Sequence, residues 1–289
     1  MSNVKNQFVT IYSNITMEQS NNRTIKRSIL KVLKYFSIFA YYPTLDEIYT
    51  FLPVKIDKNK LKYTPPQYSI PTSLKLRGAS KYQISKKKLE NWKFKTYIKL
   101  LSLTPQIKLV GLSGSISMMN AKEDDDIDLF IITIKNRLFT GRLIALVLAQ
   151  MLGLRRVRDS ATHFFHKNKV CLNLFFDEGN LKVPPFKQTE FVGHEVLQMK
   201  PIVVKGNVYE RFLGANRWVF RLFPNAPPVI PAKAGIQTKI TSFIIFNKVE
   251  QLLKKIQLKL INKHRTTEII TPTQLWFHPD DFEKKLKLQ

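Results

Sequence analysis

Two short motifs in the middle of the chain constrain its fold more than any other sequence feature. The first is Gly111-Leu-Ser-Gly114-Ser115, which ends the apolar run that starts at Ile107. The second, ten residues later, is Asp126-Ile-Asp128, which opens another apolar run. Apolar runs bounded by glycine predict strands, and glycine followed by serine predicts a turn from strand into helix. The order strand, short helix, strand, long helix, strand predicts a central unit that mixes helices and strands.

The spacing of the two aspartates indicates a metal site. Alternate side chains of a strand share a face, so Asp126 and Asp128 point together while Ile127 points into the core. Two neighbouring carboxylates repel each other, and a hard divalent cation that prefers oxygen ligands removes this repulsion. We therefore predict that Asp126 and Asp128 bind Mg²⁺ or Mn²⁺.

The Gly-Ser turn is suited to a phosphate ligand. Gly114 allows the backbone to approach a ligand closely, and the N–H groups and the Ser115 hydroxyl at a helix start suit a triphosphate. A phosphate cradle beside metal-binding carboxylates predicts metal-assisted nucleotidyl transfer from a nucleoside triphosphate. Each motif alone is common, and their combination in this order is far more specific.

The residues GLSGSISMMNAKEDDDIDLFII resemble the signature of the DNA-polymerase-beta-like nucleotidyltransferase superfamily. The wider chain, over most of residues 25–283, resembles uncharacterised bacterial nucleotidyltransferase-domain proteins in which a winged-helix-like segment precedes the catalytic domain. The resemblance implies an α+β fold with a mixed-sheet core. It also implies magnesium-dependent transfer of a nucleoside monophosphate to an acceptor hydroxyl, with Gly114 and Ser115 at the triphosphate and Asp126 and Asp128 at the metal.

The chain departs from the superfamily pattern at the third carboxylate. In KVCLNLFFDE the matching position is Asn173, a neutral amide that cannot act as a carboxylate base. Three readings stay open: Asp177 or Glu178 substitutes from the strand end, the reaction is slow, or the fold only binds nucleotide. Asn173 is equally well explained as a polar residue satisfied at a strand edge. The alternative function is thus a catalytically degenerate nucleotide-binding protein with a basic nucleic-acid-binding module.

Basic residues are concentrated before the central unit. The chain has 47 Lys and Arg against 21 Asp and Glu, a formal net charge of +26. The segment Lys55–Lys99 contains 13 Lys and Arg and 2 acids, so it contributes +11 of that total. Such clustering is typical of segments that contact nucleic acid, and a solvated charged surface is the alternative of equal weight.

Prolines, charge and periodicity divide the chain into four parts. We expect a mobile tail at residues 1–23, a basic winged-helix-like segment at 24–84, a nucleotidyltransferase core at 85–188 and a helical C-terminal region at 189–289. An exposed proline-rich loop is expected at 225–240, and its run VIPAKAGIQ resembles peptides encoded by mobile repeat elements inserted in bacterial genes.

Helices are expected outside the central unit as well. One follows Thr24, one follows the capping box Thr44-Leu-Asp-Glu47, and a lysine-rich helix starts at Ser85 and stops at Thr104. Two more apolar faces at helical spacing are expected to pack on the core. Their members are Val208, Phe212, Ala215, Val219 and Leu222 in one helix, and Val249, Leu252, Leu253, Ile256 and Leu260 in the other.

No membrane partner is expected. The most apolar segment, Leu138–Leu154, carries Arg142 and is shorter than the ~20 residues of a spanning helix, so it is predicted to be a buried core helix. The first twenty residues lack a secretory signal, and the lone Cys171, a predicted core residue, cannot form an internal disulfide. These features predict a cytoplasmic protein.

Other polar residues have competing explanations. The three arginines after the long apolar helix either bind phosphate or, as we favour, complement the negative end of that helix. The two histidines before the third strand are predicted to face solvent, and His194 and Glu195 are assigned to a helix start rather than to the active cleft. The arginines are Arg155, Arg156 and Arg158, and the histidines are His163 and His166.

Overall fold

The computed structural model describes residues 15–17, 23–63, 72–156, 167–227, 244–263 and 265–277 of the 289-residue chain. Its centre is a six-stranded sheet with the strand order β6-β3-β4-β5-β8-β7. Only β4 and β5 pair in parallel, and the other neighbours are antiparallel. The fold is therefore α+β with a mixed sheet, as predicted. The strands are β3 (Ile107–Leu112), β4 (Ile127–Thr133), β5 (Val170–Asp177), β6 (Lys200–Val204), β7 (Ile269–Ile270) and β8 (Gln274–Trp276).

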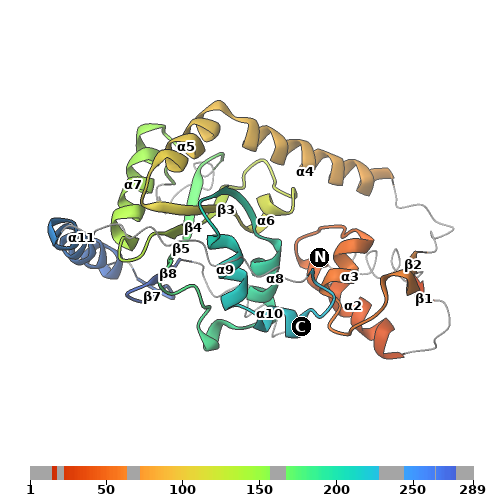
Figure 1. Cartoon of the computed structure of the whole chain (residues 1–289). Helices are drawn as coiled ribbons and strands as arrows, with labels where there is room; N and C mark the ends of the chain where they lie inside the picture. The colour runs from red at the N-terminus through yellow and green to blue at the C-terminus, as the bar shows by residue number, and fades with distance from the viewer. Residues whose placement is uncertain are drawn as a thin grey trace.

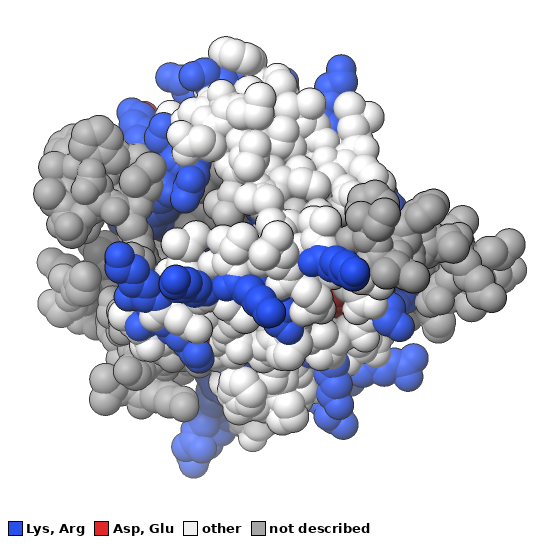
Figure 2. All heavy atoms as spheres, turned by 90° about the vertical axis from the view of Figure 1, so that its left-hand side faces the viewer, with Lys and Arg blue, Asp and Glu red and all other residues white. Residues whose placement is uncertain are grey.

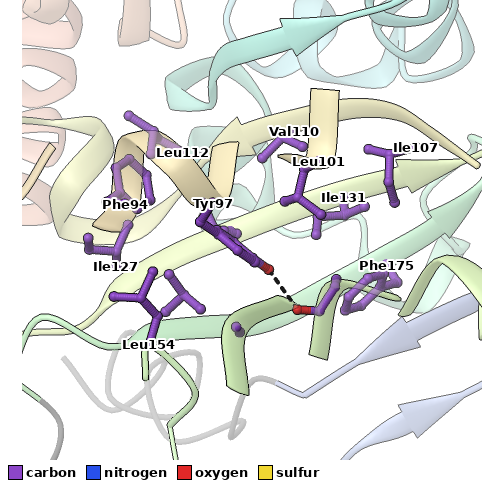
Figure 3. Packing of buried hydrophobic residues seen from close by; sticks show 14 of the residues in the cluster. Phe94, Tyr97, Leu101, Ile107, Val110, Leu112, Ile127, Ile131, Leu154 and Phe175 are labelled. Atoms are coloured by element: carbon purple, nitrogen blue, oxygen red, sulfur yellow. Dashed lines mark hydrogen bonds between the residues drawn. The ribbon is translucent and has the colours of Figure 1, made fainter. Parts of the chain in front are cut away.

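Helices cover both faces of this sheet (Figure 1). Alternation along β4 sends Leu129 and Ile131 to one face and Phe130 and Ile132 to the other. The first face packs against α5 (Trp92–Leu103) and α7 (Leu138–Met151), and the second against α8 (Glu190–Gln198), α9 (Val208–Ala215) and α10 (Trp218–Leu222). Figure 3 shows the first layer, where Tyr97 donates a hydrogen bond of 3.1 Å to the carbonyl of Ala145 and so links α5 to α7.

A separate apolar cluster holds the N-terminal helices together. These are α2 (Arg23–Ile38) and α3 (Leu45–Phe51), and the cluster also includes Met118 and Phe223 from the rest of the chain. The predicted capping box is confirmed: Thr44 Oγ1 accepts from Glu47 N, and the Glu47 carboxylate accepts from Thr44 N. The short strands β1 (Ile15–Met17) and β2 (Leu61–Tyr63) pair antiparallel beside these helices. Two helices and a two-stranded sheet are parts that a winged helix contains, and that assignment stays a prediction.

The lysine-rich helix is longer than predicted. The helix α4 runs over Thr72–Glu90, so neither the expected start at Ser85 nor the expected domain boundary between residues 84 and 85 coincides with a break. Gly78 lies inside α4, where an added Cβ would meet nothing within 4 Å. A glycine in an exposed helix costs about 1 kcal/mol relative to alanine, and the helix continues through it. The actual break is at Asn91, which caps α5.

The C-terminal region is not only helical, because it supplies β6, β7 and β8, half of the central sheet. The side chains of β6 alternate between exposed and half-buried, as is usual for a strand at the edge of a sheet. The single helix expected over residues 208–222 is divided into α9 and α10. Asn216 lies at the division, where its amide is buried and bonds to Leu181 O, Phe212 O and Val183 N.

The last helix, α11 (Ile244–Lys263), exposes four of the five residues of its predicted apolar face, and the fifth, Leu253, packs against the core. Its inner side also carries a polar residue: the buried Glu250 accepts hydrogen bonds from Phe139 N (2.8 Å) and Thr140 N (2.9 Å) at the start of α7. A carboxylate at a helix N-terminus is stabilised by the unpaired N–H groups there, which explains this orientation. Figure 2 faces α11 and shows lysines and arginines among uncharged residues, with almost no acid. The exposed apolar residues are Val249, Leu252, Ile256 and Leu260.

The remaining predictions about the ends and loops have mixed outcomes. None of the helices in the described ranges is long and apolar enough to span a membrane. The predicted core helix is α7, which ends at Met151 and packs one side into the core, while Val147 and Met151 are exposed. Of the expected tail, residues 1–14 and 18–22 lie outside the described residues, as do 228–240 of the expected exposed loop.

Candidate functional site

The sheet brings the two motifs together at one end of its strands β3 and β4. Because β3 and β4 are antiparallel and Leu112 pairs with Leu129, the end of β3 lies beside the start of β4. The short helix α6 (Gly114–Ser117) starts at this point, and Ser113 N donates a hydrogen bond of 3.0 Å to the Asp128 carbonyl. Residues that the sequence separates by ten positions therefore form one site.

Gly114 is required here for two reasons. Its φ is +61°, a backbone conformation that side-chain-bearing residues adopt only at a cost. A Cβ at this position would also lie 2.5 Å from the Asp128 carboxylate oxygen Oδ2. The glycine thus allows the backbone to approach the Asp128 carboxylate closely. Its predicted contact with a phosphate stays a prediction.

The third strand places Cys171 and Asn173 beside Asp128. Cys171 is the register partner of Asp128 in the parallel pair of β4 and β5. Asn173 Nδ2 donates to Asp128 Oδ1, and Asn173 Oδ1 accepts from Cys171 Sγ at 2.6 Å. Asn173 therefore lies next to the first carboxylates, at the place where the resemblance locates the third.

The Asp128 carboxylate is in an unfavourable electrostatic environment. Burial, followed by the charges of Asp126 and Glu195, raises the pKa of Asp128 well above its usual value. Burial also raises the pKa of the Cys171 thiol, so this sulfur is protonated at neutral pH. One ligand atom from each of Asp126, Asp128 and Cys171 lies within 4.8 Å of the others. A cation near these atoms would relieve the repulsion between the two carboxylates.

Arg156 lies in the site itself. Its Nη1 forms an ion pair of 2.6 Å with Asp126 Oδ2 and donates to Cys171 Sγ at 3.2 Å. The preferred sequence interpretation, that this arginine complements the end of α7, is therefore wrong for Arg156. Arg158, His163 and His166 lie outside the described residues.

Neither acid at the end of β5 joins the site. Asp177 pairs with Thr133, five residues along β4 from Asp128, which at a rise of about 3.3 Å per residue is ~17 Å away. Asp177 accepts instead from Asn136 N (2.6 Å) and Gly179 N (2.7 Å), and Glu178 lies against Arg211. The alternative in which one of them replaces the third carboxylate is wrong, because both lie at the opposite end of β5 from Asn173.

The helix α8 contributes a residue that sequence reasoning assigned elsewhere. Thr189 is its N-cap, so His194 and Glu195 lie in the middle of the helix rather than at its start. His194 is buried between the rings of Tyr35 and Phe51, with centroid distances of 3.6 and 4.2 Å. Glu195 lines the same cavity as Asp126 and Asp128. The sequence signal was a second acid in the helix EFVGHEVLQ, one turn beyond its first residues and between apolar positions.

The site opens into a large cavity of about 1900 Å³. Its wall combines the Gly-Ser turn and the aspartates with residues 37–40 at the end of α2 and with one side each of α7 and α11. Pockets for small ligands measure about 300–1,000 Å³, so this space exceeds the needs of one small ligand.

Ser115 is oriented by the acidic loop that precedes β4. Its hydroxyl donates to Asp125 Oδ2 at 3.0 Å, and the same oxygen accepts from Lys122 N at 2.9 Å.

Two lysines of the basic segment also point toward the protein interior: Lys81 bonds to Asn120 Oδ1 and Ala40 O, and Lys88 is buried. Part of the positive charge of Lys55–Lys99 is therefore used within the fold.

Comparisons of the chain with models of known protein families, with curated proteins and with solved structures find no match.

Proposed function

We propose that the protein is a magnesium-dependent nucleotidyltransferase with a polymerase-beta-like core that moves a nucleoside monophosphate from a nucleoside triphosphate to an acceptor hydroxyl. The observation that carries the proposal is the convergence of the Gly-Ser turn and the Asp-x-Asp strand at the mouth of one cavity. Its place of action is the cytoplasm, where triphosphates are available and a lone thiol stays reduced.

Asp126 and Asp128 fit a hard divalent cation. Their carboxylates supply oxygen ligands, and their mutual repulsion is the feature that a cation relieves. When bound, Mg²⁺ would neutralise phosphate charge and act as a Lewis acid. Gly114 and Ser115 would hold the triphosphate, with the Ser115 hydroxyl turned from Asp125 to a phosphate oxygen.

Glu195 is the candidate for the missing carboxylate. It approaches from α8 rather than from β5, lines the cavity with the two aspartates, and its charge raises the pKa of Asp128. In the proposed reaction the acceptor oxygen bonds to the α-phosphorus, the bond from that phosphorus to the bridging oxygen breaks, and pyrophosphate leaves. The hydroxyl proton passes to Glu195 as general base.

A second function, nucleotide binding without transfer, is favoured by two other contacts. Asn173 donates to Asp128, and Arg156 pairs with Asp126, so both carboxylates already have neutral or cationic partners. In this reading the basic segment Lys55–Lys99 contacts nucleic acid, and its affinity for nucleic acid should fall steeply as salt rises. A flat salt response would reject that contact.

Label transfer separates the two functions. The purified protein is incubated with Mg²⁺, α-labelled nucleoside triphosphates and cell-extract RNA, protein and metabolites, beside the double variant Asp126→Asn/Asp128→Asn. Asp124→Asn, an exposed acid of the same loop, is the matched control. If the protein is the proposed enzyme, the wild-type protein and the Asp124→Asn control transfer label, and the double variant does not. Transfer that survives the double substitution would reject the metal site, and triphosphate binding without transfer would favour the binding protein.

A further inference from the structure

The helix α4 contacts the loop between the two motifs through a buried lysine. Lys88 is only 3% exposed, and its ammonium group donates three hydrogen bonds. The acceptors are Glu123 O at 2.9 Å, Asp125 O at 2.7 Å and Asn168 Oδ1 at 3.2 Å. A lysine offers three donors and no acceptor, so these bonds use the whole capacity of the group.

Two more residues on the same face of α4 bind the start of this loop. Ser85 Oγ accepts from Ala121 N at 3.0 Å, and Lys81 Nζ donates to Asn120 Oδ1 at 3.0 Å. Residues 81, 85 and 88 are spaced four and three positions apart, which places them on one side of a helix. The loop is therefore held along its length by one ridge of α4.

This loop connects the two halves of the proposed site. Asp125, whose carbonyl Lys88 binds, accepts the Ser115 hydroxyl through its side chain at 3.0 Å. The next residue is Asp126, which the same peptide unit positions at the start of β4. A displacement of the Asp125 peptide would therefore move the phosphate-side serine and the first metal-side carboxylate together.

We propose that Lys88 is a positioning residue that keeps the Gly-Ser turn and the Asp126/Asp128 pair in their relative arrangement, an inference that rests on the proposed function. Its ammonium group does not touch the reacting atoms. It acts through the carbonyls of Glu123 and Asp125, so one lysine of the basic segment has a structural role within the fold.

The test uses Mn²⁺ as the probe and compares Lys88→Met with Lys87→Met. Lys87 is the exposed neighbour on the same helix, so the control also removes a positive charge near Glu123 but leaves the hydrogen bonds of Lys88 to the loop in place. We expect Lys88→Met to weaken Mn²⁺ binding at least tenfold and to speed amide hydrogen exchange in residues 119–126. Lys87→Met should leave both unchanged. Glu250→Gln, which weakens a distant contact, shows whether lower stability alone changes Mn²⁺ affinity.

Mn²⁺ binding and amide hydrogen exchange test the proposed metal site and the role of Lys88 separately. If wild-type protein binds no Mn²⁺, the proposed metal site is wrong, and exchange in residues 119–126 still reports whether Lys88 holds the loop. If folded Lys88→Met keeps wild-type exchange and Mn²⁺ affinity, the positioning role is wrong. If Lys88→Met does not fold, Ser85→Ala decides, since it removes the bond to Ala121 N and should speed exchange there about threefold or more. Unchanged exchange in Ser85→Ala would then overturn the proposal.

Discussion

The substitution Gly114→Ala tests the geometry of the site most directly. It adds one methyl group where the backbone has φ +61° and where that group would lie 2.5 Å from Asp128 Oδ2. Asp128 cannot move away freely, because its other oxygen accepts from Asn173. The variant therefore combines a backbone penalty with a collision against a held carboxylate.

The two penalties can be estimated and separated. An alanine in the left-handed region costs roughly 1–2 kcal/mol. Insertion of a methyl group into a packed site costs about 1–3 kcal/mol more. Gly206 has φ +65° and no atom within 4 Å of an added Cβ, so Gly206→Ala carries the backbone penalty alone. We expect Gly114→Ala to lose about 2–5 kcal/mol of unfolding free energy and Gly206→Ala about 1–2 kcal/mol.

Equilibrium urea unfolding measures both free energies, and Mn²⁺ or triphosphate titration of the folded variants measures the site. Gly114→Ala should weaken ligand binding because the methyl group displaces Asp128, whereas Gly206→Ala should bind as wild type. If the two variants lose equal stability and bind equally well, the close contact between Gly114 and Asp128 does not exist in solution, and the site geometry derived from it is wrong.

Three further predictions concern α11, α8 and the proposed base. Glu250→Gln should destabilise the protein by about 1–3 kcal/mol in urea unfolding, because a charged acceptor at the start of α7 is lost, while the exposed Glu90→Gln should change it by less than about 0.5 kcal/mol; equal losses would contradict the capping role. Burial lowers the pKa of His194 well below its usual value of about 6.5, so the unfolded state binds the proton first as pH falls. Stability should then be independent of this group above about pH 6.5 and fall below it by up to about 1.4 kcal/mol per pH unit, a slope that His194→Phe should reduce; an unchanged slope would show that another group is responsible. Glu195→Gln should lower the rate of label transfer at least tenfold while triphosphate affinity stays within about threefold, as expected for a general base; an unaffected rate would remove Glu195 from the mechanism.

Predictions that depend on neighbouring residues agree best with the structure. The capping box at Thr44, the buried helix α7 and the strands β3, β4 and β5 all follow from alternation, capping and apolar spacing within a few residues. The proximity of Gly114 to Asp128 depends in addition on the antiparallel pairing of β3 and β4, which places the end of one strand beside the start of the other.

Predictions failed where the partner of a residue is distant in the chain. Four of the five apolar residues of α11 that were predicted to face the core are exposed, whereas Glu250 is buried because its carboxylate meets N–H groups at the start of α7, 110 positions away. The sequence also left open which acid completes the site. Asp177 and Glu178 are near Asn173 in the chain, but they lie at the far end of β5, away from the two aspartates. Glu195, from α8, lines the cavity instead.

The sequence by itself determined the local chemistry: a Gly-Ser turn after one strand, two aspartates on one face of the next, and an amide where a carboxylate was expected. Only the tertiary structure decided which groups surround them, namely Arg156 on Asp126, Asn173 on Asp128 and Lys88 beneath the acidic loop. The physical reason is the distance along the chain between the residues that interact. Backbone geometry relates residues a few positions apart, whereas contacts across the fold depend on how whole helices and strands pack.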